Sequence, residues 1–204
     1  MWMGAPVANA LIAVLLLAGL PFLGYFIWHK WRYERAFAEI ARRAGLQGSD
    51  TRYVLISAAV AVAVVCVLLL WQPPMAPFMG KGSPQHAFVG LGWSVPAIVM
   101  ALLYGVVQTG FVEELVFRGL IAGSLARRLP LAWANLLQAL VFMLPHLLVL
   151  RTMPSLWMLL PLVFVLALVM GWVRIRSGSI LGPWLMHATL NVTMCLMAAV
   201  RTAG

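Results

Sequence analysis

The sequence predicts an all-α protein, a polytopic membrane helix bundle with about six transmembrane helices and one short cytoplasmic amphipathic segment. Hydrophobic residues make up 64% of the 204 residues, only 9% are charged, and the mean hydropathy is +0.99. Apolar runs of roughly the 20 residues that a helix needs to cross the hydrocarbon core recur along the chain. We therefore expect one integral membrane domain and no soluble module.

The charges and the cysteines argue against two other classes of protein. The formal net charge is +9, but the basic residues lie in short connections between apolar runs. There they indicate membrane topology rather than nucleic-acid binding. The two cysteines, Cys66 and Cys195, both lie in apolar runs. They form neither a disulfide framework nor a metal-ligand pattern, so we expect them to pack among the helices.

The first apolar run, residues 6–28, is followed by a basic stretch, residues 29–52. No basic segment precedes this run, and it is too long for the apolar part of a signal peptide. Apolar residues recur at helical spacing in the basic stretch, and they are Phe37, Ile40, Ala41 and Ala44. We expect a short amphipathic helix on the cytoplasmic membrane surface that ends near Gly45, or a solvated connector without membrane contact.

Five further apolar stretches follow. The first of them, residues 53–71, precedes a turn-rich segment whose prolines and glycines argue against regular structure. The next, residues 88–126, is nearly twice the length needed to cross the bilayer. We expect either one long tilted helix there or a break near Gly105 or Gly110. The remaining three stretches cover residues 131–150, 156–173 and 180–200.

Basic residues predict the orientation of the bundle. If the N-terminus lies outside, ten Lys and Arg residues fall on the cytoplasmic side and three fall outside, as the positive-inside rule favours. The ten are six residues between positions 29 and 52 together with Arg127, Arg128, Arg174 and Arg176, and the three are Lys81, Arg151 and Arg201. We expect both termini outside, in a bacterial inner membrane.

The third stretch carries the most unusual charges of the chain. Residues 108–120, QTGFVEELVFRGL, contain two adjacent glutamates and an arginine. A charged side chain at this depth costs about 2.5–3.5 kcal/mol on insertion scales, so it needs a partner. Glu114 and Arg118 are four residues apart and share a helix face, whereas Glu113 points about 100° away. The pair alone would be a structural ion pair that locks helices together, but Glu113 then lacks a partner and is a candidate functional group.

Two further polar pairs are predicted at membrane depth. Phe142 and His146 are four residues apart beside Pro145, which we expect to open the helix, and His187 and Asn191 are also four residues apart. A rise of 1.5 Å per residue places the candidate polar groups at depths of about 14–24 Å from the cytoplasmic helix ends. These groups are Glu113, His146, His187 and Asn191. We therefore expect one site built from three helices.

The chemistry of these groups favours hydrolysis by water. A carboxylate and an imidazole can take a proton from a trapped water, and a second imidazole and an amide can stabilise the oxyanion that follows. Neither a serine nor a cysteine nucleophile with an obvious base is present in the sequence. A zinc ion held by Glu113, His146 and His187 is the alternative, although the HExxH pattern is absent and the histidines lie on different helices.

EELVFR, FMLPH and HATLN resemble, in order, the EExxxR, FxxxH and HxxxN motifs of the CAAX-protease and bacteriocin-processing (CPBP, or Abi) family of intramembrane endopeptidases. The resemblance covers roughly residues 100–195, as a catalytic core, and leaves residues 1–99 as an N-terminal part with two spans and the basic loop. It implies a glutamate-type protease without a cofactor. Glu113 and His146 would activate water, His187 and Asn191 would form the oxyanion hole, and the supporting residues would be Glu114, Arg118 and Phe142.

The resemblance leaves two functions to distinguish. The first is an endopeptidase that cuts a peptide or protein substrate at the membrane, such as a C-terminal tail or a leader of an exported protein. The second is a non-catalytic immunity or scaffold protein in which the polar cluster is structural. Both have the lipid bilayer as partner and neither involves nucleic acid. The short chain, with six spans, argues against the prenylated substrates of the eukaryotic members.

Overall fold

The computed structural model describes residues 4–73, 75–79, 83–151 and 153–202, and within these ranges every regular element is helical. Six helices are long and apolar enough to cross a membrane, which confirms the predicted all-α polytopic bundle. Their bounds are Ala5–Tyr33, Thr51–Trp71, Val95–Ala126, Leu131–Val149, Pro154–Ser177 and Leu181–Arg201. The protein is therefore a multi-pass membrane protein.

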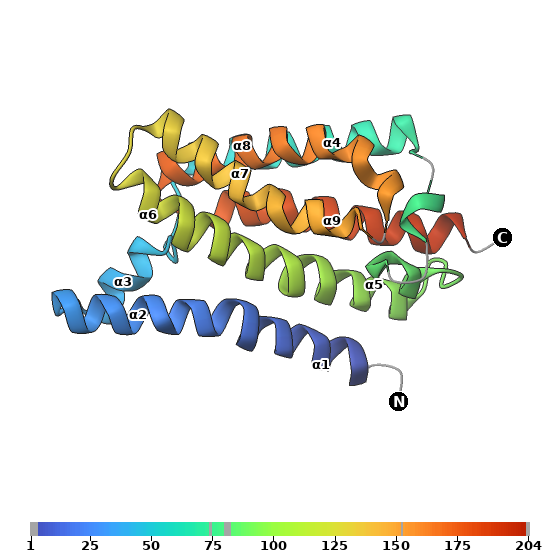
Figure 1. Cartoon of the computed structure of the whole chain (residues 1–204). Helices are drawn as coiled ribbons and strands as arrows, with labels where there is room; N and C mark the ends of the chain where they lie inside the picture. Colours follow the sequence, from blue (N-terminus) through green and yellow to red (C-terminus); the bar gives the residue numbers. More distant parts are fainter. Residues whose placement is uncertain (1–3, 74, 80–82, 152, 203–204) are drawn as a thin grey trace.

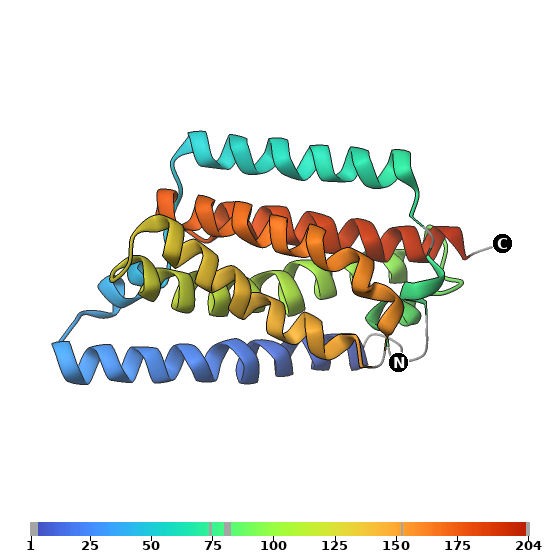
Figure 2. The same cartoon turned by 45° about the horizontal axis from the view of Figure 1, so that its top comes forward.

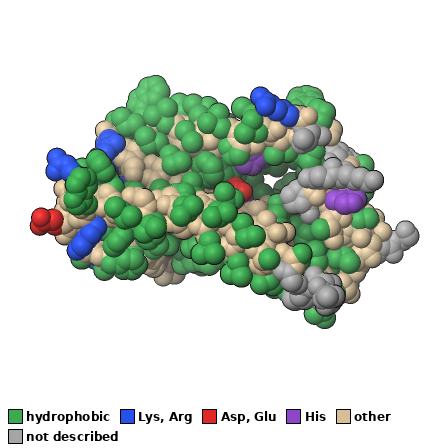
Figure 3. Space-filling view, turned by 60° about the horizontal axis from the view of Figure 1, so that its bottom comes forward, with side chains coloured by type: hydrophobic (Ala, Val, Ile, Leu, Met, Phe, Trp, Pro, Cys, Tyr) green, Lys and Arg blue, Asp and Glu red, His purple; other side chains and the backbone are tan. Residues whose placement is uncertain are grey.

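The last helix, α9 (Leu181–Arg201), lies at the centre of the bundle. Half of its apolar window is buried, against 17% for each of the first two spans. It packs between α4 (Thr51–Trp71), α8 (Leu160–Ser177) and the long helix that starts with α5 (Val95–Leu102), as Figures 1 and 2 show. The flanks of the bundle are covered by exposed hydrophobic side chains, as contact with lipid requires (Figure 3).

The third span is one continuous helix rather than two, and it begins at Val95 instead of position 88. Ser94 caps it by accepting a hydrogen bond from the backbone N–H of Ala97 at 3.3 Å. The helix contains two π-helical stretches, η4 (Leu103–Phe111) and η5 (Glu114–Ala122). Such stretches are rare and occur frequently at functional sites. Glu113 lies between the two.

Glycine allows α9 to approach this long helix closely. A Cβ atom at Gly105 would lie 2.8 Å from the backbone nitrogen of Val192 and 3.3 Å from the carbonyl oxygen of Ala188. A side chain at this position would therefore push the two backbones apart. Gly105 is thus a packing residue and not the helix break that the sequence left open.

The amphipathic segment forms helix α3 (Phe37–Arg43), and Gly45 follows it with a φ of 80°, as expected of a C-terminal cap. One side of its apolar face packs against the protein, whereas Phe37 is 62% exposed. Ile40 and Ala44 are fully buried in the protein, and Ala44 packs in one cluster with Leu115 of the long helix. Amphipathicity predicts an apolar face, but it does not distinguish lipid from a neighbouring helix as the surface that covers it.

The remaining connections agree with the sequence in outline. The turn-rich segment forms two short 3₁₀ turns, η2 (Ala76–Phe78) and η3 (Pro84–Phe88), and η6 (Pro154–Leu159) leads into α8. The prediction that Lys81 lies outside the cell concerns a position beyond the described residues. The described start of α1 (Gly4–Ile12) and the end of α9 lie at the same end of the bundle (Figure 1), as six crossings require.

The orientation can be tested with topology reporters. A reporter fused after Arg42 is expected to behave as cytoplasmic, and one fused after Arg201 as external, because ten of the fourteen basic residues would then lie inside. Alkaline phosphatase and green fluorescent protein, which are active on opposite sides of a bacterial membrane, give the measurement. The reverse pattern of activity would overturn the orientation.

Candidate active site

The two adjacent glutamates occupy different environments, because successive residues of a helix point in different directions. Glu114 is fully buried, and its Oε1 lies 3.1 Å from Nη1 of Arg118, which is also fully buried. The predicted pair is therefore present. Glu113 keeps 31% of its side chain exposed, and its carboxylate lines a cavity. One glutamate neutralises the buried arginine while the other faces open space.

His187 of α9 lies between the two carboxylates. Its Nδ1 is 2.8 Å from Oε1 of Glu114, and its Nε2 is 3.9 Å from Oε2 of Glu113. The first contact is a hydrogen bond within the buried part of the bundle, which the motifs do not indicate. The imidazole is therefore held by Glu114 and presents its other nitrogen to Glu113.

Helix α7 (Leu131–Val149) contributes His146 and Phe142. Nδ1 of His146 lies 3.0 Å from the carbonyl oxygen of Phe142, and a carbonyl can only accept, so Nδ1 carries the proton. In the neutral ring, Nε2 is then the acceptor, and His146 lines the same cavity as Glu113. Pro145 does not open the helix as expected, since α7 continues to Val149.

Phe142 contacts three other side chains of the cluster. The guanidinium carbon of Arg118 lies 3.9 Å from the centre of its ring, within the range of a cation–π interaction. The ring also contacts His146 at 4.7 Å and His187 at 6.2 Å between centroids. Because Phe142 is itself buried, it closes the space between the arginine and the two histidines.

Asn191 is positioned by residues that the sequence analysis missed. Its Nδ2 donates to Oγ1 of Thr109 at 2.7 Å, and that hydroxyl donates to the carbonyl oxygen of Tyr104 at 2.9 Å. Both partners lie in the π-helical stretch η4. Thr109 could have been found, because it precedes Glu113 by four residues and so falls on the same helix face.

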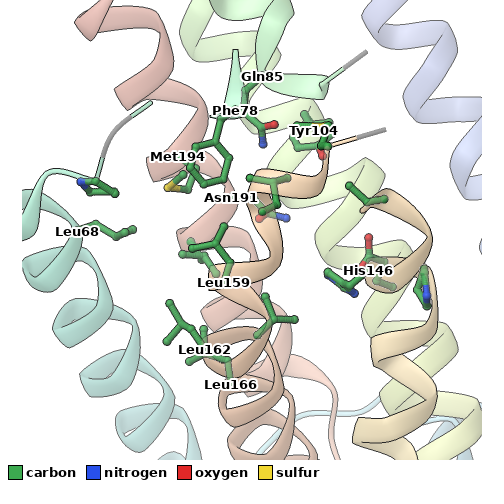
Figure 4. A pocket seen from close by; sticks show the side chains of 18 of the residues that line it. Leu68, Phe78, Gln85, Tyr104, His146, Leu159, Leu162, Leu166, Asn191 and Met194 are labelled. Carbon is green, nitrogen blue, oxygen red and sulfur yellow. The ribbon is translucent and has the colours of Figure 1, made fainter. Parts of the chain in front are cut away.

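These groups surround a cavity of about 330 Å³. Glu113, His146 and Asn191 are in its wall, and Figure 4 shows His146 and Asn191 flanking it from different helices. His187 is not among the lining residues, but its Nε2 lies 3.9 Å from Oε2 of Glu113, which is one of them. Most other lining side chains are apolar and come from α4, α8, α9 and the connections at one end of the bundle. The structure thus brings the four candidate catalytic residues together.

Within the described ranges, no group of three His, Cys, Asp or Glu side chains has an arrangement that could hold a metal ion. Zinc needs three or four such ligands in its first shell. Glu113, His146 and His187, the alternative zinc ligands, are not arranged as such a group.

The fold and the cluster define a multi-pass membrane protein with a polar site around an internal cavity. Residues 93–193 match the family model described as Rce1-like, type II CAAX prenyl endopeptidase. This segment of the chain matches the Rce1-like CAAX protease family, as the three motifs indicated. No curated protein and no solved structure matches the chain. The matched segment contains every side chain of the cluster, and this match supports a membrane-embedded peptidase.

Proposed function

We propose that the protein is an intramembrane endopeptidase that hydrolyses a peptide bond of a membrane-associated or exported protein with water activated by Glu113 and His146. The observation that carries this proposal is the shared cavity. A carboxylate from the long helix and an imidazole nitrogen from α7 line the same space, and both can accept a proton. We place the protein in a bacterial inner membrane.

The reaction begins when a water molecule between Glu113 and His146 attacks the carbonyl carbon of the scissile bond. The new C–O bond forms as the water proton passes to Glu113, and the carbonyl electrons move to oxygen. The tetrahedral intermediate then collapses, the C–N bond breaks, and the proton is returned to the leaving amine. The products are a carboxylate and an amine. Because Glu113 has given up the proton that it took, the enzyme is unchanged.

Asn191 and His187 stabilise the oxyanion in this proposal. One N–H of Asn191 is held by Thr109, and the second remains to donate into the cavity. Two carboxylates and one guanidinium leave the cluster with one excess negative charge, which a protonated His187 balances. Its Nε2–H then donates on the side of Glu113, where the oxyanion develops.

Glu114 and Arg118 support this arrangement without touching the substrate. Both are fully buried, and Glu114 connects the arginine to Nδ1 of His187. The carboxylate therefore holds the imidazole in one orientation. Phe142 packs against the arginine and both histidines, so its ring keeps the α7 and α9 residues at a constant separation.

A non-catalytic scaffold is the alternative, and the buried Glu114–Arg118 pair is the observation that favours it. A purely structural cluster would have no reason to leave Glu113 partly exposed in a cavity. Co-expression with candidate membrane-anchored exported proteins, followed by mass spectrometry of the membrane fraction, separates the two functions. The parent protein is expected to yield a shortened product that Glu113→Gln does not, whereas identical fragment patterns would support the scaffold.

Thr109 offers a test of how Asn191 is positioned. Thr109→Val keeps the shape of the side chain but removes the hydroxyl that holds the amide, so turnover is expected to fall about three- to tenfold, the value of one hydrogen bond. Thr109→Ser keeps the hydroxyl and should restore turnover. The measurement is kcat and KM for all three proteins, with the loss expected in kcat. A Val variant as fast as the parent would contradict the positioning role.

A further inference from the structure

We propose that the active site is reached from the extracytoplasmic side of the membrane, so that the substrate is an apolar, extended segment of a membrane-anchored protein that has already been exported. This inference rests on the proposed function and adds to it the side of access and the class of substrate. Three observations carry it: the end of the bundle near which the cavity lies, the end at which the bundle is sealed, and the distribution of the basic residues.

The cavity lies toward one end of the bundle. Helix α7 ends at Val149, about one turn after His146. The catalytic imidazole therefore lies close to this end. The connection that follows α7 and the segments that follow α4 line the cavity at the same end, through Met153, Leu156, Leu159, Trp71, Pro73, Phe78 and Gln85. Glu113 and His146 line the same cavity as these segments.

The described residues seal the opposite end. On the C-terminal side of Glu113, the long helix is buried at Glu114, Leu115 and Arg118. A Cβ atom at Gly119 would lie 2.6 Å from the carbonyl oxygen of Ala44, so the segment after α3 is in close contact with the long helix. The same segment is tied to the start of α9, because the backbone N–H of Ile180 donates to the carbonyl of Gly45 at 3.1 Å.

Arginines reinforce this seal. Arg174 is buried, and its Nη2 donates to the carbonyl oxygen of Arg43 at 2.9 Å, at the C-terminal end of α3. Arg127 donates to the same carbonyl at 3.3 Å and to the hydroxyl of Tyr25 at 2.8 Å. Positive charge at a helix C-terminus is favourable. These contacts join α2 (Leu20–Tyr33), α3, α8 and the end of the long helix into one closed layer.

The charge distribution assigns the two ends to the two sides of the membrane. The sealed end carries ten Lys and Arg residues, at positions 29–52, 127–128 and 174–176. At the end near the cavity, the Lys and Arg residues that the structure describes are Arg151 and Arg201. The positive-inside rule places the sealed end in the cytoplasm. The cavity therefore lies toward the exterior, and a substrate must have crossed the membrane before it is cut.

The wall of the cavity defines the chemistry of the substrate. Its side chains are mainly aliphatic and aromatic, and no Lys or Arg lines it among the described residues. Figure 3 shows a hollow on the flank of the bundle in which an acidic and a histidine side chain are visible between hydrophobic ones. An extended apolar stretch beside a membrane anchor fits this wall.

Thiol labelling tests the side of access without depending on catalysis. The parent for this experiment is Cys66→Ala/Cys195→Ala, since these are the two cysteines of the chain. Into it we place Met194→Cys or Gln85→Cys, both in the cavity wall, or Ser49→Cys, in the sealed layer. A charged, membrane-impermeant methanethiosulfonate is added to spheroplasts, which expose the outer face, or to inverted vesicles, which expose the cytoplasmic face.

The expected result is complete modification of Met194→Cys and Gln85→Cys in spheroplasts and its loss in inverted vesicles, with the opposite pattern for Ser49→Cys. Modification of Met194→Cys from the cytoplasmic face, or from neither face when the denatured protein reacts fully, would overturn the inference. Repeating the labelling on Glu113→Gln separates the two proposals. If that variant still cleaves substrate while labelling follows the expected pattern, the proposed mechanism fails and the side of access stands.

Discussion

Glu113→Gln is expected to abolish most turnover while leaving the protein folded. The amide keeps the size of the carboxylate but cannot take the proton of the attacking water, so we expect a loss of about 10²–10⁴-fold. Glu113 is partly exposed in the cavity and makes no ion pair with Arg118, so thermal unfolding in detergent should stay close to that of the parent. The measurement is the cleavage rate at equal amounts of folded protein.

Glu39→Gln is the matched control for this substitution. Glu39 lies in α3 at the sealed end, is 41% exposed, and pairs with Arg35 and Arg43. Surface pairs of this kind contribute about 0–1 kcal/mol to stability. The control should cleave at the parent rate. If both variants lose activity equally, the effect of Glu113→Gln is not specific to the cavity.

Glu114→Ala is expected to lower the amount of folded protein as well as activity. The substitution strands Arg118, which is fully buried and forms its one ion pair within the described residues with Glu114. Breaking a buried pair from one side typically costs about 3–5 kcal/mol. It also removes the acceptor that holds Nδ1 of His187. Thermal unfolding in detergent and the yield of monodisperse protein give the measurement.

A double variant, Glu114→Leu/Arg118→Met, separates charge from packing. Removing both members of a buried pair leaves no stranded charge and is often neutral or stabilising. The double variant should therefore regain folded protein without regaining activity. A single Glu114→Ala protein as stable as the parent would contradict a structural role for the pair, and an active Glu113→Gln beside it would mean that the two glutamates have exchanged roles.

The architecture could be predicted because hydropathy and helical periodicity are local properties. Each predicted span became a helix in nearly the same place, since a membrane leaves few alternatives to a fully hydrogen-bonded helix. The pairing of Glu114 with Arg118 followed from their spacing of four. His187 and Asn191 share a face of α9 for the same reason, although which groups they would contact did not follow from spacing.

The remaining features depend on how distant segments pack. The π-helical stretches of the third span have no signature in hydropathy, so the sequence left its continuity open. The burial of Ile40 and Ala44 depends on a surface formed by other helices. Nothing in the sequence distinguishes Thr109 from other polar residues. Its role depends on α9, which places Nδ2 of Asn191 2.7 Å from its hydroxyl oxygen. Tertiary contacts, rather than local preference, determine these details.

One measurement tests the central claim, that water activated at Glu113 and His146 hydrolyses a peptide bond. Purified protein is incubated in H₂¹⁸O with the intact form of a substrate identified by the co-expression experiment. The reaction is quenched with acid and analysed by intact-mass spectrometry. We predict one ¹⁸O atom in the new C-terminal carboxylate, an unchanged enzyme mass at every time point, and labelled product from Glu113→Gln that forms about 10²–10⁴-fold more slowly. An enzyme mass increased by an acyl fragment, or labelled product at the parent rate from Glu113→Gln, would contradict the account.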